Sequence, residues 1–374
     1  MKEGKVHFKG FNAMRAIAAL TVVVVHTFEF SDRFGFDKSK LGFFPKIEHF
    51  SYLSVDFFFV LSGFLITYLL MVEKEKYDTI SVKQFYIRRI LRIWPLYYLL
   101  FFVAFVVCPF LPNFDAEIKN QGLQLLLYGT FFANLAYILG QKTAILGVTW
   151  SVAVEEQFYL VWPIFSKKAS DFKVMALKVI FGYLSLKFFL FCLDRFVFHE
   201  NNQFIHVLFQ FVEVTKIDCM AIGALGSIYL YNNGPSKIQS INKYFVIGFL
   251  LFVIWFSYQH FYLTQFYNEI HAMLYTLVLL IIATRPKLAN FLENRLSIFL
   301  GNISYGIYML HMVVVAFTAT YLKQFWASNP SFEMFVLLEL FIICTTILLA
   351  WLSYTFFEKK FLLLKKRFTK VQSG

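Results

Sequence analysis

Long apolar segments recur along almost the whole chain, and short polar stretches separate them. About eleven of these segments approach the ~20 residues that a helix needs to cross the hydrocarbon of a membrane. They lie at residues 11–31, 52–72, 93–112, 121–139, 147–165, 173–193, 208–231, 244–262, 269–284, 298–321 and 334–356. This pattern predicts an all-α integral membrane protein in which residues 1–374 form a single membrane-embedded domain.

The charges beside the apolar segments predict how the chain is oriented. Both ends are basic, at Lys2, Lys5 and Lys9 and again after Glu358. Because basic flanks stay on the cytoplasmic side of a membrane, both termini are expected in the cytoplasm. An even number of crossings follows from that expectation.

The number of crossings can be counted from either end of the chain. On these counts, basic loops such as 285–297 lie on the cytoplasmic side of the membrane. The two counts agree only if either 121–139 or 147–165 fails to cross, and the choice between them stays open. We therefore expect about ten transmembrane helices and one non-spanning or irregular segment near 121–165, with irregular backbone around 140–165.

The composition excludes an ordinary soluble domain. Hydrophobic residues make up 59% of the chain and charged residues only 16%, whereas about 25% is usual for soluble domains. The net charge of +12 could suggest a nucleic-acid partner, but the basic residues cluster in short loops beside apolar runs. This arrangement favours a multi-pass protein of the plasma (inner) membrane. The lipid bilayer is its expected partner, and no nucleic-acid partner is expected.

The first apolar segment contains Arg15 and His26. An ionisable side chain within a span costs ~2.5–3.5 kcal/mol on insertion, so such residues are functional candidates. Eleven residues is almost three helical turns, which places both side chains on one face about 16 Å apart. The alternatives are an arginine that reaches the cytoplasmic interface and a histidine satisfied by one packing hydrogen bond.

A second candidate is the cluster formed by Arg88, Arg89 and Arg92. On a helix, Arg89 and Arg92 share a face, and guanidinium groups bind phosphates bidentately. The alternative is ordinary positive-inside charge beside a span.

A third candidate is the pair of adjacent acids Glu155 and Glu156 within an apolar run. On a helix, Glu155 shares a stripe with Phe158, Tyr159 and Trp162. The alternative is an interfacial helix whose acids lie in headgroup water. Weaker candidates, each of which alone more often forms a helix–helix hydrogen bond, are Asp56, Ser62, Asp218 and His311.

Together, a buried histidine, buried carboxylates and an arginine cluster favour acid–base chemistry on a phosphate-bearing donor. Coenzyme A carries phosphates and is cytoplasmic, so it fits the arginines. The sequence has no Walker glycine loop, no GxGxxG after a strand and no HExxH metal motif, so kinases, dehydrogenases and metalloproteases lack support.

Ordered stretches covering about residues 10–365 resemble the bacterial acyltransferase 3 family, membrane O-acyltransferases of surface polysaccharides, lipopolysaccharide O-antigens, lipids or antibiotics. The most specific stretch is Trp150 to Pro163. The others are Arg15 to His26, Val55 to Phe64, Arg89 to Arg92, Ile303 to Tyr308 with His311, and Tyr354 to Lys359. The chain departs from the family pattern at Asn12-Ala13, Lys216 and Lys360, away from His26 and the arginine pair.

The resemblance implies that His26 is the catalytic histidine, with Glu155 as a second catalytic residue. It implies that Arg15, Arg89 and Arg92 bind the donor. The remaining candidates are expected to support them, namely Asp56, Ser62, Trp150, Glu156, Tyr159, Asp218 and His311. No metal or permanently bound cofactor is expected, and no fused extracytoplasmic esterase-like domain.

The resulting hypothesis is a transfer of an acyl group, most simply acetyl, from acyl-CoA to a hydroxyl of a carbohydrate or glycolipid acceptor. The alternative is a transporter or flippase that uses the same buried charges as a permeation path. Transporters often contain inverted repeats and paired broken helices, and the sequence shows neither.

Overall fold

The computed structural model describes residues 6–42, 47–259 and 266–369. Within these ranges the regular structure consists of α-helices with short 3-10 and π-helical turns, which confirms the predicted all-α class. The basic residues Lys2, Lys5 and Lys370 and the last three positions of the predicted segment 244–262 lie outside the described residues.

Seven helical stretches of the described chain are long and apolar enough to cross a membrane, which confirms a multi-pass membrane protein. In three of them, the α-helix continues directly into a π-helical turn. The seven are α1 (Phe11–Glu29), α2 (Phe50–Tyr77), α3 (Val82–Phe102, continuing to Phe110), α7 (Phe172–Cys192, continuing to Val197), α12 (Tyr267–Thr284), α14 (Arg295–Tyr321) and α16 (Phe332–Leu352, continuing through α17, Lys359–Lys365, to Phe368).

The other apolar helices of the described chain are shorter or carry more charge. They are α6 (Trp150–Lys168), α8 (Gln203–Thr215), α9 (Ile217–Asn233) and α11 (Lys243–Gln259). Short helices in the connections are α10 (Ser236–Gln239), α13 (Pro286–Leu292) and α15 (Lys323–Ala327).

The segment expected at 121–139 is not a single helix. It forms α4 (Gln121–Gly129) and α5 (Ala133–Ile138), with Phe131 between them in the left-handed region at φ 59°. Such helices rise only about 14 and 9 Å, too little to cross a bilayer. Residues 150–168, by contrast, form the continuous helix α6. The irregular backbone is therefore at 121–149. The expectation of irregular backbone around 140–165 is confirmed for 140–149 and wrong for 150–165.

The predicted segment 208–231 is also interrupted, because Lys216 adopts a left-handed conformation (φ 43°, ψ 39°) between α8 and α9. The break lets the side chain of Lys216 turn inward to a carboxylate instead of continuing the helical stripe. Sequence periodicity alone does not reveal such a break, because neither glycine nor proline marks it.

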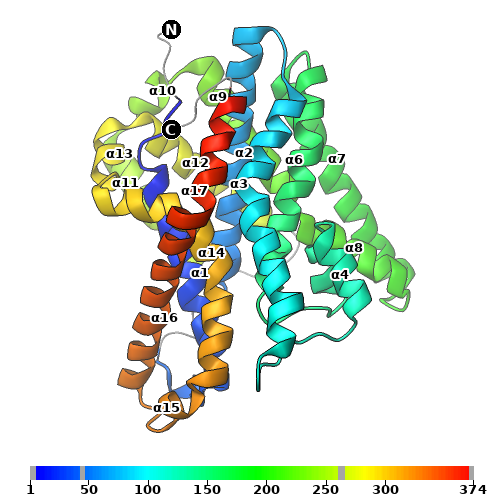
Figure 1. Cartoon of the computed structure of the whole chain (residues 1–374). Helices are drawn as coiled ribbons and strands as arrows, with labels where there is room; N and C mark the ends of the chain where they lie inside the picture. The colour runs from blue at the N-terminus through cyan, green and yellow to red at the C-terminus, as the bar shows by residue number, and fades with distance from the viewer. Residues whose placement is uncertain (1–5, 43–46, 260–265, 370–374) are drawn as a thin grey trace.

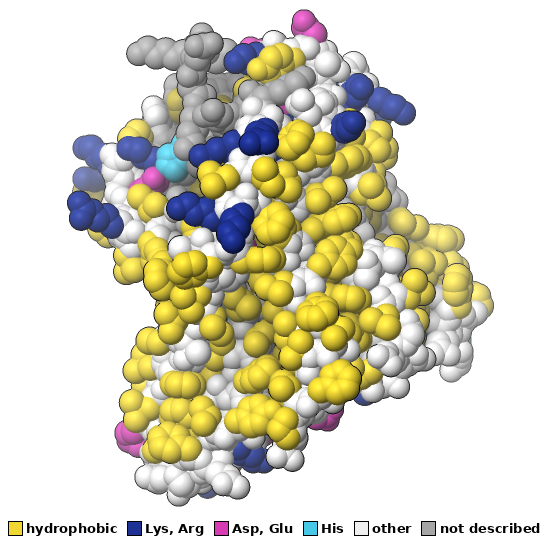
Figure 2. All heavy atoms as spheres, in the orientation of Figure 1, with side chains coloured by type: hydrophobic (Ala, Val, Ile, Leu, Met, Phe, Trp, Pro, Cys, Tyr) yellow, Lys and Arg dark blue, Asp and Glu magenta, His cyan; other side chains and the backbone are white. Residues whose placement is uncertain are grey.

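The helices form a bundle in which α1 packs between α2 and α14, and α2 in turn packs against α9 and α12 (Figure 1). The start of α1 and helix α17 lie at the same end of the bundle. Figure 2 shows Lys and Arg side chains gathered at this end, above a broad apolar band. This is the charge distribution that a membrane protein with one basic aqueous face requires.

Two glycines allow α2 and α9 to approach closely. A Cβ atom on Gly63 would lie 1.9 Å from the carbonyl oxygen of Met220, and one on Gly223 would lie 2.1 Å from that of Val60. No side chain fits at either position, so the backbones touch directly, as small residues permit in membrane helices. This contact sets the position of α2, which carries several candidate residues.

We predict that Gly63→Ala destabilises the protein strongly, because the clash is with backbone that cannot rotate away. Gly182→Ala is the matched control, since Gly182 lies within α7 and nothing is within 4 Å of its Cβ position. Alanine there should be neutral or stabilise by up to about 1 kcal/mol. Thermal unfolding of the detergent-solubilised variants measures both, and equal midpoints would contradict the packing role of Gly63.

Candidate active site

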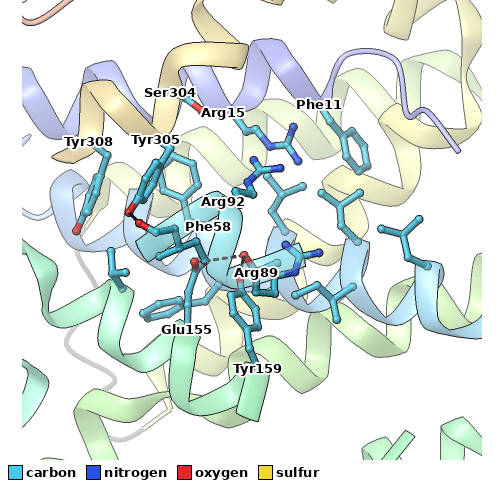
Figure 3. A pocket seen from close by; sticks show the side chains of 18 of the residues that line it. Phe11, Arg15, Phe58, Arg89, Arg92, Glu155, Tyr159, Ser304, Tyr305 and Tyr308 are labelled. Atoms are coloured by element: carbon cyan, nitrogen blue, oxygen red, sulfur yellow. Dashed lines mark hydrogen bonds between the residues drawn. The ribbon is translucent and has the colours of Figure 1, made fainter. Parts of the chain in front are cut away.

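An open cavity of about 1310 Å³ lies among helices α1, α2, α3, α6, α14 and α17. Its lining combines cations, aromatic rings and a carboxylate, among them Phe11, Arg15, Ser62, Arg92, Glu155 and Tyr305 (Figure 3).

Positive charge dominates the lining. Arg15, Arg89 and Arg92 contribute three cations and Lys365 a fourth basic side chain, whereas Glu155 is the one acidic residue that lines the cavity within the described chain. Figure 3 shows Arg15, Arg89 and Arg92 converging on the same space from α1 and α3. None of these four basic side chains forms an ion pair with a described carboxylate. Like charges held together without a carboxylate in direct contact are costly, so the cavity is suited to an anion.

Aromatic rings and a polar contact hold the arginines in place. The guanidinium of Arg89 lies 5.3 Å from the ring centroids of both Phe85 and Tyr159. Arg15 donates a hydrogen bond from Nη1 to Asn12 Oδ1 at 3.3 Å. The remaining guanidinium donors are available to a ligand, and the Nε atom of Arg89 is buried without a partner.

Arg88 behaves differently from its neighbours on α3. Its Nη2 atom lies 3.1 Å from Glu73 Oε2, and Nη1 donates to the Phe368 carbonyl oxygen at 3.0 Å. Arg88 therefore ties α3 to α2 and to the chain after α17. The structure separates it from Arg89 and Arg92, which face the cavity.

Glu155 belongs to a small hydrogen-bonded group on the α6 side of the cavity, where Tyr159 also contacts Arg89 (Figure 3). Ser62 Oγ donates to Glu155 Oε1 at 2.5 Å, and the Tyr159 hydroxyl donates to Ser62 Oγ at 3.1 Å. Helices α2 and α6 supply these residues, and Tyr159 follows Glu155 by one turn. The stripe predicted on this helix is confirmed, since Phe158, Tyr159 and Trp162 are all buried.

Aromatic side chains close the far end of the cavity. Phe58 and Tyr308 pack edge to face with centroids 6.1 Å apart. The Tyr308 hydroxyl donates to the Val148 carbonyl oxygen at 3.0 Å and lies 2.7 Å from Ser151 Oγ. These contacts fix Tyr308 as a wall.

His26 lies outside the cavity lining, in contact with His311 of α14. His26 Nδ1 and His311 Nε2 are 2.8 Å apart, and the two rings are nearly parallel, at 8°. On its other side, His311 Nδ1 lies 2.6 Å from the carbonyl oxygen of Tyr308. The histidine pair is therefore linked directly to the wall residue Tyr308.

The second ring nitrogen of His26 points toward a carboxylate. Its Nε2 atom lies 3.7 Å from Glu29 Oε2, and Ser51 Oγ donates to the other Glu29 oxygen at 3.3 Å. The His26 side chain is 17% exposed and that of Glu29 is 28% exposed, whereas His311 is completely buried. His26 and Glu29 are therefore both partly accessible, whereas His311 is not.

The structure does not bring the two predicted catalytic residues together. Glu155 shares the cavity with the arginines, whereas His26 contacts His311 and Glu29. Arg15 and His26 do lie on one helix, but Arg15 faces the cavity and His26 faces α14. Their predicted roles stay predictions.

Asp56 and Asp218 lie in a separate buried cluster that does not line the cavity. Lys216 Nζ donates to Asp56 Oδ1 at 2.6 Å and to Asn268 Oδ1 at 3.1 Å. Lys187 Nζ donates to Glu269 Oε1 at 2.8 Å, and the Asp218 carboxyl is within hydrogen-bonding reach of Glu269. These residues tie together α2, α7, α9 and α12. Neither aspartate lines the cavity, and the supporting role predicted for both stays a prediction.

Two further predicted residues also lie outside the cavity lining. Trp150 packs against the rings of Phe59 and Tyr137. Glu156 points away from Glu155 and accepts a hydrogen bond from Trp94 Nε1 at 2.9 Å. In the described residues, no three His, Cys, Asp or Glu side chains form a group that could hold a metal ion.

Sequence reasoning missed Lys365 and Glu29. Lys365 reads as ordinary basic flank, and nothing in the sequence places it in the cavity. Glu29, however, follows His26 by three residues, so helical spacing alone could have placed it on the same face.

Residues 8–355 match the acyltransferase domain of the acyltransferase 3 family, so the chain belongs to this family. The predicted family and its acyltransferase class are thereby confirmed. No solved structure matches.

Similar proteins are O-acetyltransferases by name. Peptidoglycan O-acetyltransferase OatA of Listeria monocytogenes is 26% identical, with 93% of this chain and 54% of OatA covered. "Putative peptidoglycan O-acetyltransferase YrhL" of Bacillus subtilis is also 26% identical, with 94% of this chain and 54% of the relative covered. The chain thus spans about half the length of these curated relatives.

We predict that Asp56→Asn or Lys216→Met alone lowers stability by about 3–5 kcal/mol, because each leaves the other charge buried without its partner. The double variant should recover part of this loss. Lys237→Met, at an exposed lysine of α10, is the control and should change little. Chemical or thermal unfolding in detergent tests this, and two independent, additive losses would contradict the pairing.

Proposed function

We propose that this protein is a membrane O-acyltransferase that moves an acetyl group from acetyl-CoA to a hydroxyl of a cell-envelope carbohydrate. The observation that carries the proposal is the cavity of three arginines and Lys365, none of them ion-paired, that ends at Tyr308, one helical turn from the His26–His311 pair. Membership of the acyltransferase 3 family supports the reaction class.

The donor site is argued from charge. Arginine guanidiniums bind phosphate oxygens in bidentate pairs and keep their charge when buried. Coenzyme A carries several phosphates at one end and the thioester at the other. With the phosphates at Arg15, Arg89 and Arg92, its long pantetheine arm would run past Ser62 and Glu155 toward Tyr308.

The acceptor site is inferred from the residues on the other side of the wall formed by Phe58 and Tyr308. His26 and Glu29 are partly exposed, whereas the cavity lies behind Tyr308 and Phe58. His26 would take the proton of the acceptor hydroxyl as a general base. The names of OatA and YrhL, which refer to peptidoglycan, support peptidoglycan as the acceptor here.

The proposed orientation in the membrane rests on the same division between a donor side and an acceptor side. The basic end of the bundle, with α17 and the start of α1, would face the cytoplasm of the plasma membrane and admit acetyl-CoA. Ten crossings fit this placement of both termini. They would be α1, α2, α3, α6, α7, the α8–α9 pair, α11, α12, α14 and α16.

We predict that donor binding and transfer can be separated by mutation. Arg92→Ala should weaken acetyl-CoA binding about 10- to 100-fold, the value of a charged hydrogen bond to phosphate. His26→Ala should leave binding unchanged and reduce transfer by about 10²–10⁴-fold, the usual contribution of a general base. Titration of purified protein with acetyl-CoA and mass spectrometry of peptidoglycan O-acetylation measure the two.

Lys83→Ala is the control on the same helix, because Lys83 is exposed and does not line the cavity. It should alter neither quantity. Loss of acetyl-CoA binding in His26→Ala, or unchanged acetylation in it, would contradict the division of roles.

We also predict the orientation directly. A fluorescent reporter fused after the C-terminal residue should be bright, as cytoplasmic fusions are, and alkaline phosphatase fused there should be inactive. A phosphatase inserted between residues 200 and 201, at the turn after α7, should be active. The opposite pattern would contradict a cytoplasmic donor face.

A further inference from the structure

We propose that His311 is a positioning residue that fixes the tautomer of His26, so that Nε2 of His26 is the bare nitrogen that meets the acceptor hydroxyl. The proposal rests on the proposed function, because it assigns a task to His26 in acyl transfer. The proposal goes beyond that function because it names the residue that determines which nitrogen of His26 reacts.

The argument begins at Tyr308, whose carbonyl oxygen can only accept a hydrogen bond. His311 Nδ1 lies 2.6 Å from this oxygen and must therefore carry the proton. A neutral imidazole has one N–H group, so His311 Nε2 is an acceptor. His26 Nδ1 lies 2.8 Å from it and must donate. The bare nitrogen of His26 is then Nε2.

The surroundings of His311 support the neutral form that this argument needs. The side chain is completely buried, and it forms no ion pair with any described residue. A charged imidazolium in such a place would be costly, whereas a neutral ring with both nitrogens hydrogen-bonded is satisfied. Because Tyr308 precedes His311 by one turn of α14, the helix itself supplies the fixed acceptor.

The bare nitrogen also faces the accessible side. His26 Nε2 points toward Glu29, at 3.7 Å, and His26 is partly exposed there. The opposite tautomer would place its lone pair against His311 Nε2, where no substrate can reach. One neutral histidine thus performs the orienting task that an aspartate performs in a Ser-His-Asp triad.

The reaction balances on these atoms. His26 Nε2 takes the proton of the acceptor hydroxyl while the acceptor oxygen bonds to the acetyl carbon. The carbon–sulfur bond then breaks, and the proton on Nε2 passes to the departing thiolate of coenzyme A. Throughout, the His26 Nδ1–H bond to His311 holds the ring and stabilises its positive charge.

The test compares His311→Leu, which removes the acceptor, with His311→Gln, whose amide oxygen can replace it. Wild type and variants are reconstituted in vesicles with acetyl-CoA and soluble peptidoglycan fragments. For His311→Leu we expect kcat to fall about 100-fold or more, with the KM for acetyl-CoA unchanged. His311→Gln should recover a large part of kcat. His199→Asn, at an exposed histidine in the turn after α7, is the control and should retain full activity.

A double variant distinguishes positioning from general structural damage. If His311 acts only through His26, then His26→Ala combined with His311→Leu is no slower than His26→Ala alone. Additive losses, a parallel rise in KM, or equal activity of the Leu and Gln variants would overturn the proposal.

A second readout does not depend on the reaction. Nitrogen NMR of ¹⁵N-histidine-labelled protein in nanodiscs, with His26 assigned by difference from His26→Ala, reports which ring nitrogen is protonated. We expect Nδ1 protonated and Nε2 bare in wild type, and a mixture of tautomers in His311→Leu. Wild type that shows this tautomer but no transfer from acetyl-CoA would refute the proposed donor and leave the role of His311 standing. Wild type with Nε2 protonated would refute the role of His311.

Discussion

A charged side chain within a bilayer has to face protein or a polar cavity, since exposure to hydrocarbon costs at least ~2.5–3.5 kcal/mol. Helix α1 carries two ionisable residues, and each satisfies this constraint in a different way. Arg15 turns into a cavity that it shares with three other basic side chains, and His26 turns to a second histidine. The two solutions differ in what they leave open. The basic side chains form no ion pairs with described carboxylates, whereas the histidines satisfy each other and His26 stays partly exposed.

Helix α2 connects the rest of the fold to this arrangement. Its glycine contact with α9 fixes its axis, and Asp56 reinforces that contact through Lys216 at the break before α9. Less than two turns further along α2, Ser62 reaches Glu155 in the cavity. The buried ion pair and the cavity thus lie on two faces of one helix. Close packing and paired charge together hold the cavity wall in place.

The sequence predicted what depends on local pattern, and missed what depends on distant parts of the chain. Apolar length predicted most of the helices, and helical spacing grouped Arg89 with Arg92. Nothing local distinguishes Arg88, whose partner Glu73 is on another helix. Nor could spacing pair His26 with His311, because 285 residues separate them. The break at Lys216 was equally hidden, since a tertiary ion pair stabilises it.

The wall formed by Phe58 and Tyr308 gives the site its direction. It separates the basic cavity from a histidine that is partly exposed on the other side. In the proposed reaction, a thioester long enough to pass the wall would deliver its acyl group while its phosphates stay behind, so the charged part of the donor never has to cross. The same Tyr308 supplies, through its carbonyl oxygen, the hydrogen bond that orients His311. The side chain that bounds the cavity and the backbone atom that holds His311 therefore belong to one residue, which couples the geometry of the cavity to that of the histidine pair.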